Sequence, residues 1–347
     1  MLVDSPPEAT AAPVVPRRRQ ATRSAGLLVA LCVLGAIAVL GIAVGSKQIP
    51  LADVWHGLTQ YSGTDTDVII RDVRLPRTVL GLLAGAALGL AGAVMQALTR
   101  NPLADPGVLG INAGASAAVV SGITFFGVTS LTAYVWFAFV GAAVVSAAVY
   151  ILGGTRSATP VRLALAGTAL TAVLTGYLNA VNLMNTASLD KMRFWTVGSL
   201  AAATMPTVEK IAPFIAAGVV LALLVARPLN AVALGDDQAR ALGAKLTRTR
   251  VAAMAAVTLL CGAATAACGP IVYVGLMVPH AVRAITGPDM RWILPYSAVL
   301  SPVLLLGADI LGRIAARPGE IQVGIVTAVI GGPVFIHLVR RRKMAQL

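Results

Sequence analysis

Long apolar stretches separated by short polar loops run through the chain from about residue 25 to residue 339. An α-helix rises 1.5 Å per residue, so about 20 apolar residues cross the hydrocarbon core of a bilayer. Two runs nearly touch at Gly269-Pro270 and around Ser130, and a re-entrant segment at either place would change the count of spans. The pattern predicts about ten transmembrane helices, at residues 25–44, 76–98, 108–127, 131–152, 161–185, 207–226, 249–269, 271–287, 292–312 and 322–339.

Composition supports an all-α polytopic membrane protein. The chain is 57% hydrophobic and 12% charged, whereas a soluble domain carries about 25% charged residues. Its net charge of +13 would favour nucleic-acid binding in a soluble protein. Here the basic residues lie in short loops, where they set orientation, so we expect no nucleic-acid partner. The three cysteines, Cys32, Cys261 and Cys268, lie in apolar runs without a CxxC pair and are expected to be small core residues.

The N-terminal 23 residues are rich in Pro, Ala and Arg and are expected to form a disordered cytoplasmic tail. The apolar run that follows is longer than the roughly 7–15 residues of a signal peptide, so we expect a retained span. Residues 24–347 then form one transmembrane domain. With the N-terminus in the cytoplasm, 18 of the 27 lysines and arginines lie inside. The positive-inside rule therefore places both termini in the cytoplasm.

The exceptions to that rule gather beside two spans. Arg71, Arg74 and Arg77 precede the second predicted span, and Arg313 and Arg317 follow the ninth. Such a cluster on the disfavoured side indicates a binding surface, although arginines at helix ends also reach toward lipid headgroups. Asp309 lies four residues before Arg313, a spacing that allows an ion pair within the helix, worth only tenths of a kcal/mol if exposed.

Small and polar residues mark the interiors of several spans. Gly81, Gly85 and Gly89 repeat every four residues, a pattern typical of close helix packing in membranes. Gln96, near the inner end of the same span, needs a partner in the bundle or contact with water. A stripe of amides on the fifth span is equally consistent with a pathway lining and with hydrogen bonds between helices. The amides are Asn179, Asn182 and Asn185.

The longest polar stretch between inner spans runs from Arg227 to Arg250. Asp236 and Asp237 suit the positive end of a short helix dipole, and Gly243 suits a left-handed C-terminal cap. A short capped helix on the cytoplasmic surface could dock a soluble partner. A solvated amphipathic loop is the alternative.

Enzymatic chemistry finds little support in the sequence. It contains no GxxxxGK[ST] phosphate-binding loop, and its three histidines, His56, His280 and His337, do not have metal-ligand spacing. We therefore expect no ATPase site, no cofactor and no metal site in this chain, and no catalytic residues.

Several segments resemble the FecCD-type permeases of ABC importers, a family that includes iron-siderophore, haem and vitamin B12 permeases. They occur in the family's order and cover most of the chain from about residue 70 to residue 341, although the N-terminal tail is longer than the family pattern. The segments are RLPR at 74–77, GAVMQALTRNPLADPGVLGINAGA at 92–115, LGDDQARALG at 234–243, GPIVYVGLMVPHAVR at 269–283, ADILGR at 308–313 and VGIVTAVIGGPVFIHLVRR at 323–341.

The resemblance implies a type II ABC importer permease bundle in the cytoplasmic (inner) membrane. Its partners would be a second permease subunit, identical or a close paralogue, two ATP-binding subunits, and an extracytoplasmic substrate-binding protein. The matching arginines Arg74, Arg77 and Arg313 would dock the binding protein. A coupling-helix loop at 234–248 would contact the ATPase through residues that match the family motif: Asp236, Asp237, Ala241, Leu242 and Gly243.

The resemblance thus implies an importer permease, most simply one through which an iron(III)-siderophore passes, by alternating access that ATP hydrolysis on separate subunits drives. Haem and cobalamin remain alternatives within the family. Gln96 and the three asparagines are the candidate pathway residues. An ion-coupled secondary transporter would be expected to place acidic or basic coupling residues in mid-membrane. Apart from Asp309, near a span end, the sequence offers no credible carboxylate there.

Overall fold

The computed structural model describes residues 17–45, 47–128, 130–154, 160–185, 192 and 195–341, and these fold into helices without a β-strand. The all-α fold class is thereby confirmed for the described part of the chain. In chain order the helices are α1 (Arg17–Ala43), α2 (Leu51–Thr59), α3 (Asp65–Val68), η1 (Ile69–Arg74), α4 (Leu75–Leu98), η2 (Pro106–Leu109), α5 (Ile111–Phe126), α6 (Leu131–Leu152), α7 (Pro160–Met184), α9 (Met205–Ala233), α10 (Asp236–Ala241), α11 (Leu246–Cys268), α12 (Val274–Thr286), α13 (Met290–Ala315) and α14 (Val323–Arg341).

A helix lies at each of the ten predicted runs, but the helices differ in length. Seven of them, α1, α4, α6, α7, α9, α11 and α13, are long and apolar enough to cross a membrane. The apolar helices α5, α12 and α14 are shorter. With 13 residues, α12 extends about 20 Å, less than the roughly 30 Å of a hydrocarbon core. Ten crossings therefore stay a prediction, and a re-entrant α12 remains open.

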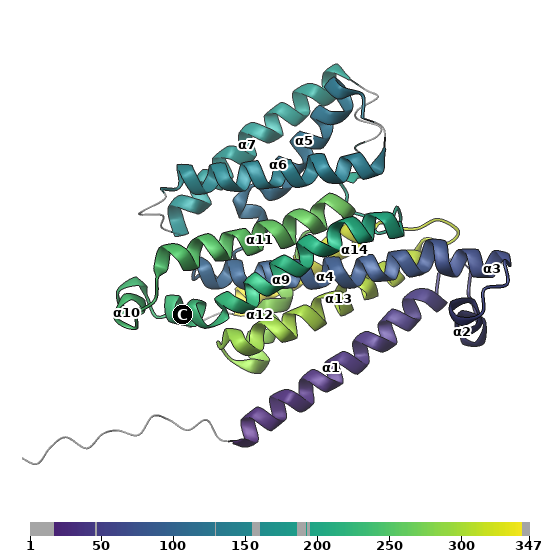
Figure 1. The fold of residues 1–347 in the computed structure, drawn as a ribbon, viewed down its shortest axis with the longest axis horizontal. Helices are drawn as coiled ribbons and strands as arrows, with labels where there is room; N and C mark the ends of the chain where they lie inside the picture. Colours follow the sequence, from purple (N-terminus) through teal and green to yellow (C-terminus); the bar gives the residue numbers. More distant parts are fainter. Residues whose placement is uncertain are drawn as a thin grey trace, which may run out of the picture.

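Helix α4 lies at the centre of the bundle, packed between α11, α13, α9 and α12 (Figure 1). Its predicted glycine face is confirmed as a packing surface. A Cβ atom at Gly85 would lie 2.5 Å from Cα of Pro302 on α13, and one at Gly92 would lie 1.8 Å from the carbonyl oxygen of Gly275 on α12. Only glycine allows backbones to approach so closely in a setting where packing replaces the hydrophobic driving force.

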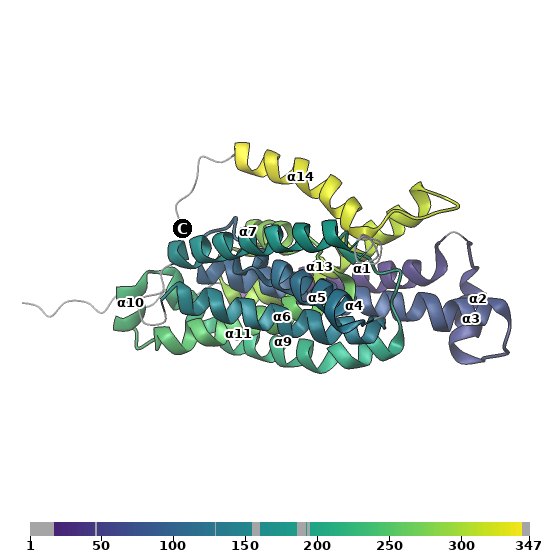
Figure 2. The ribbon, with the colours of Figure 1, turned by 90° about the horizontal axis from the view of Figure 1, so that it is seen from above.

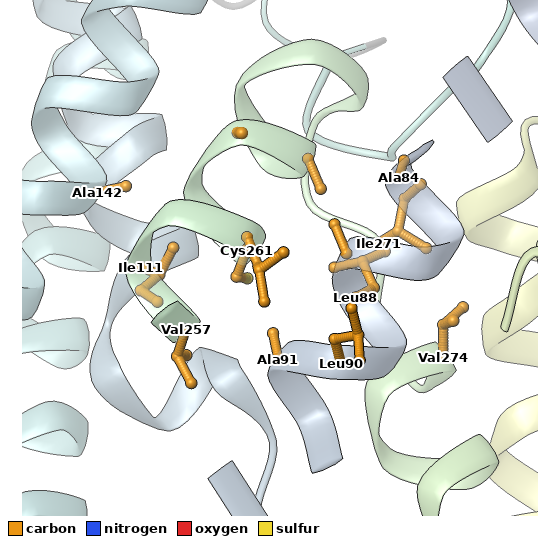
Figure 3. Packing of buried hydrophobic residues seen from close by; sticks show 14 of the residues in the cluster. Ala84, Leu88, Leu90, Ala91, Ile111, Ala142, Val257, Cys261, Ile271 and Val274 are labelled. Carbon is orange, nitrogen blue, oxygen red and sulfur yellow. The ribbon is translucent and has the colours of Figure 1, made fainter. Parts of the chain in front are cut away.

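The apolar core surrounds α4 and α11. Figure 3 shows Cys261 of α11 among side chains such as Ala91 of α4 and Ile111 of α5, and all three belong to one buried cluster. Cys261 and Cys268 are buried, as expected for small core residues. The same expectation was wrong for Cys32, which is exposed on α1. The reason is that α1 packs only one side against the bundle, so much of its apolar surface stays uncovered.

The long axis of the molecule separates two ends. Helices α2 and α3 lie at one end and α10 at the other (Figures 1 and 2). The described start of α1 lies toward the α10 end in Figure 1, and the last described turn of α14 lies toward the same end in Figure 2. Helices α5, α6 and α7 form a group that meets the rest of the bundle mainly through α11. The α2–α3 end and the α10 end hold the two predicted docking regions.

Candidate functional site

The three predicted docking arginines come together at the α2–α3 end. Arg74 closes η1, Arg77 lies in the first turn of α4, and Arg313 lies in the last turn of α13. All three line one cavity of about 440 Å³. The other lining residues are Gly45, Lys47, Ile69, Val73, Ala201, Pro318, Gly319 and Glu320.

Asp309 is the centre of this arginine cluster. Its Oδ1 lies 2.7 Å from Nη2 of Arg77, and its Oδ2 lies 3.1 Å from Nη2 of Arg313. The predicted i,i+4 pair between Asp309 and Arg313 is therefore confirmed. Both pairs are buried, with 1% of the Asp309 side chain exposed, 8% of Arg77 and 6% of Arg313. Removing one partner of a buried pair leaves an uncompensated charge, so these contacts matter far more than an exposed pair would.

Arginines also hold the C-terminal end of α1. The last carbonyl groups of a helix have no partner within the helix, and here guanidinium groups supply the missing donors. The bonds run from Arg74 to the carbonyls of Ile42 (2.6 Å), Ala43 (2.8 Å) and Lys47, from Arg313 to those of Gly41 (3.0 Å) and Val44 (2.8 Å), and from Arg317 to that of Gly45 (2.7 Å). Arg74 and Arg313 thus point into the protein, and snorkelling toward lipid headgroups does not describe them.

Two further charged residues of the cavity escaped the sequence reasoning as members of the site. Glu320 lies 2.8 Å from Nη1 of Arg77, and 38% of its side chain is exposed. Lys47 is exposed at the rim, just after α1. Both residues lie in loops next to span ends, and the only sequence signal was that Lys47 adds one more positive charge on the disfavoured side.

At the opposite end, α10 is a short helix with a defined stop. The amide of Gly243 donates to the carbonyl of Arg240, and the amide of Ala244 donates to that of Ala239. With Gly243 at φ +79, this is the Schellman arrangement that ends helices in a left-handed residue. The predicted capped helix is confirmed. Ala239 faces inward, whereas Ala241 and Leu242 are exposed, Leu242 by 67%.

The two acidic residues of α10 have different surroundings. Asp236 lies 2.7 Å from Nη2 of Arg250 on α11 and 3.5 Å from Nη2 of Arg100, in the loop after α4. Asp237 pairs at 3.0 Å with Arg240 on the exposed side of α10. Asp236 therefore fastens α10 to the ends of α4 and α11, whereas Asp237 contributes to the surface.

The loop that follows α4 is also fixed by its own side chains. The Asn101 carboxamide accepts the amide hydrogen of Leu103 at 2.9 Å. Burial raises the pKa of the Asp105 carboxyl above its ordinary value, although Asp105 accepts a hydrogen bond from the amide of Gly107 at 2.8 Å. These bonds hold the loop in place beside Arg100.

Gln96 lies inside the subunit and not on an open surface. Its side chain is fully buried, its Nε2 donates to the carbonyl of Leu276 at 3.0 Å, and its Oε1 accepts from Nη1 of Arg283 at 2.9 Å. This amide joins α4 to α12. In this conformation it has no exposed atoms to offer to a pathway.

The asparagines of α7 are more accessible. Asn179 is exposed, and Asn182 and Asn185 are half-buried. The Oδ1 atom of Asn182 is covered and has no hydrogen-bond partner within the described residues. A partly uncovered amide stripe fits a surface that another subunit or a water-filled path covers, and the pathway role stays a prediction.

The described residues contain no group of three or more His, Cys, Asp or Glu side chains placed to hold a metal ion.

The sequence profile of the FecCD transport family matches residues 30–341. The chain belongs to the FecCD transport family. Members of this family are permease subunits of ABC importers, so this FecCD permease is a multi-pass membrane transport subunit.

Several relatives have names that specify a transported compound. The ferric enterobactin transport system permease protein FepD of Escherichia coli (strain K12) is 48% identical over 323 residues, which cover 91% of this permease and 94% of FepD. The Fe(3+)-citrate import system permease protein YfmD of Bacillus subtilis (strain 168) is 38% identical over 325 residues. The aligned region covers 94% of this permease and 97% of YfmD. Relatives named for hemin and cobalamin transport are 34% and 35% identical.

A solved structure has the same fold. It is described as an inward-facing conformation of a metal-chelate type ABC transporter, and it superposes on this FecCD permease with a TM-score of 0.82 at 25% identity. The match covers 92% of this permease and 100% of that chain. The helical arrangement of the ABC importer permeases is therefore the fold of this protein.

Proposed function

We propose that this permease carries iron(III)-siderophores across the cytoplasmic membrane. In this proposal an extracytoplasmic binding protein delivers the chelate, a second permease subunit completes the path, and two separate ATPase subunits drive alternating access. The observation that supports the substrate class is the higher identity to FepD, named for ferric enterobactin, than to the relatives named for hemin and cobalamin. Haem and cobalamin remain the alternatives.

The α2–α3 end is the proposed docking surface for the binding protein. The described residues that line its cavity include one carboxylate, that of Glu320, and four cationic side chains, Lys47, Arg74, Arg77 and Arg313. Such a surface favours an acidic partner, and charge complementarity raises the rate of encounter and fixes register more than it raises affinity. Because Arg74 and Arg313 are held by carbonyls of α1, a docked partner would press directly on α1 and α13.

The α10 end is the proposed contact with the ATPase. Ala241 and Leu242 offer an exposed apolar surface just before Gly243. Asp236 would transmit movement of α10 to the loop after α4 and to α11 through its two arginines. Because α4 runs from Arg77 at one end to this loop at the other, it can link the two contacts mechanically.

The central path is proposed to run between two permease subunits and to be lined by the amides of α7. Neutral amides can contact a polar chelate without holding it as tightly as fixed charges would. An ion-coupled mechanism finds less support, because Asp309, the carboxylate that the sequence offered for it, is buried between two arginines.

Uptake of labelled cargo tests this function. A strain that lacks the permease gene is supplied with the gene on a plasmid, and uptake of ⁵⁵Fe bound to a catecholate or a hydroxamate siderophore is compared with uptake of labelled haem and cobalamin. We expect restored uptake of a ferric siderophore only, and its loss when the partner ATPase carries a hydrolysis-deficient substitution. Restored haem or cobalamin uptake would replace the substrate assignment, and uptake without ATP hydrolysis would exclude the importer mechanism.

A further inference from the structure

We propose that Glu320 occupies, in the undocked permease, the place on Arg77 that a carboxylate of the delivering protein takes on docking. Glu320 would then act as an internal competitor that weakens docking. This inference rests on the proposed docking function of the α2–α3 end.

The Arg77 guanidinium divides its donors between two carboxylates. Nε and Nη2 donate to Asp309 at 3.1 and 2.7 Å, whereas Nη1 donates to Oε2 of Glu320 at 2.8 Å. A guanidinium presents its donors in a planar fork, so one edge can stay bound while the other exchanges partners.

The two carboxylates differ in how freely they can dissociate from the Arg77 guanidinium. The Asp309 side chain is 1% exposed, lies within α13 and also pairs with Arg313. The Glu320 side chain is 38% exposed and lies in the loop between α13 and α14. Glu320 can rotate into water and be solvated there, whereas an Asp309 carboxylate that left its partners would stay buried without them.

The other two docking candidates lack such an exchangeable partner. Arg74 donates to the backbone carbonyls of Ile42, Ala43 and Lys47. Arg313 donates to two more backbone carbonyls near the end of α1 and to the buried Asp309. Among the three arginines, Arg77 is therefore the one whose outer edge an incoming carboxylate can take by displacing an exposed side chain, without moving the backbone or a buried carboxylate.

The cavity favours this exchange in one direction. Among the described residues that line the cavity, Glu320 is the one carboxylate, and Lys47 is exposed at the rim. When Glu320 turns outward, the outer edge of Arg77 and the Lys47 ammonium are left to a partner of opposite charge. The class of partner is thus a protein surface with a protruding Asp or Glu side chain.

A binding measurement with matched variants tests the competition. The complete transporter, with its ATPase subunits, is reconstituted in nanodiscs. The probe is the ferric-siderophore binding protein whose deletion abolishes uptake in the strain described above. Glu320→Gln removes the competing charge, and Glu209→Gln removes the charge of an exposed glutamate in the first turns of α9 as a control for long-range electrostatics. Size-exclusion profiles and basal ATP hydrolysis confirm that each variant is assembled.

We expect Glu320→Gln to bind the probe about two- to fivefold more tightly than the wild type, the range that matches a partly exposed ion pair. Glu209→Gln should change affinity by less than that. In an Arg77→Lys background, which keeps a cation beside Asp309, Glu320→Gln should have little effect. Unchanged or weaker binding by Glu320→Gln, or an equal gain in Glu209→Gln, overturns the competition.

Failure of the proposed docking itself gives a different result. If Arg77→Lys binds the probe as tightly as the wild type, the partner does not use Arg77, and the docking assignment falls. If the wild-type transporter does not bind the probe at all, the docking assignment and the competition fall together.

Discussion

The α2–α3 end and the α10 end both have arginine–carboxylate pairs, but they bury them differently. At the α2–α3 end Asp309, Arg77 and Arg313 are almost completely covered. At the α10 end Asp237 pairs with Arg240 in water, with 97% of the Asp237 side chain exposed. The charges of the first end therefore stabilise the fold as well as any docking, whereas the second end can lose surface charges without structural cost.

This difference changes how docking is tested. Reversing Arg77 to Glu would place a third carboxylate beside Asp309 and Glu320 in a buried site. Loss of uptake in such a variant would then report misfolding as readily as lost docking. Substitutions at Glu320 or Lys47, which are exposed, separate the two effects.

The largest expected effect comes from Asp309→Ala. It leaves Arg77 and Arg313 buried without their shared carboxylate, which should lower the free energy of unfolding by about 3–5 kcal/mol. Unfolding in detergent micelles measures this loss. Asp237→Ala is the matched change at the α10 end and should change the free energy of unfolding by no more than about 0.5 kcal/mol. Equal losses in the two variants would contradict the contrast between the ends.

The close packing of α4, the helix that runs between the two ends, is tested at Gly92. Gly92→Ala places a Cβ 1.8 Å from the Gly275 carbonyl oxygen, so α4 and α12 must separate. We expect the free energy of unfolding in detergent micelles to fall by about 1–3 kcal/mol, typical of overpacking. A Cβ atom on Gly307 of α13 would meet open space among the described residues, and Gly307→Ala should be neutral or stabilising by about 0.4–1 kcal/mol. A neutral Gly92→Ala would show that the close approach is not required.

A smaller effect is expected from Asp236→Asn, which weakens the attachment of α10 to Arg100 and Arg250. Stability should fall by about 1 kcal/mol, the range of a partly exposed pair. The more informative readout is the stimulation of ATP hydrolysis by loaded binding protein, which should fall while basal hydrolysis persists. Asp237→Asn serves as the control, and the same fall in both variants would remove the special position of Asp236.

The smallest effect on stability is expected from Leu242→Ala, because 67% of this side chain is exposed. The free energy of unfolding should change by less than about 0.5 kcal/mol. Binding of the ATPase subunit should weaken by roughly tenfold, as for an apolar side chain at the centre of an interface. Co-purification at graded ATPase concentrations measures this, and undiminished binding would place the ATPase contact elsewhere.

Several local features could be predicted because they depend on neighbours in sequence. The glycine face of α4 follows from spacing, and so do the cap at Gly243 and the Asp309–Arg313 pair. The burial of that pair could not be predicted, because it depends on Arg77 and α1, which are far away in the chain. For the same reason Gln96 was predicted to meet a partner or water, but its bonds to Arg283 and Leu276 required the packing of α12 against α4.

The sequence by itself determined a helical membrane protein, the approximate positions of its helices and the two charged regions that mark its ends. These follow from hydropathy, periodicity and local turn chemistry, which act over a few residues. Only the tertiary structure decided that the outer arginines hold the end of α1, that Asp309 joins two of them and that Glu320 occupies the outer edge of Arg77. In a buried site the partner of a charge depends on which helices pack together, and that is set by contacts between residues more than 200 positions apart.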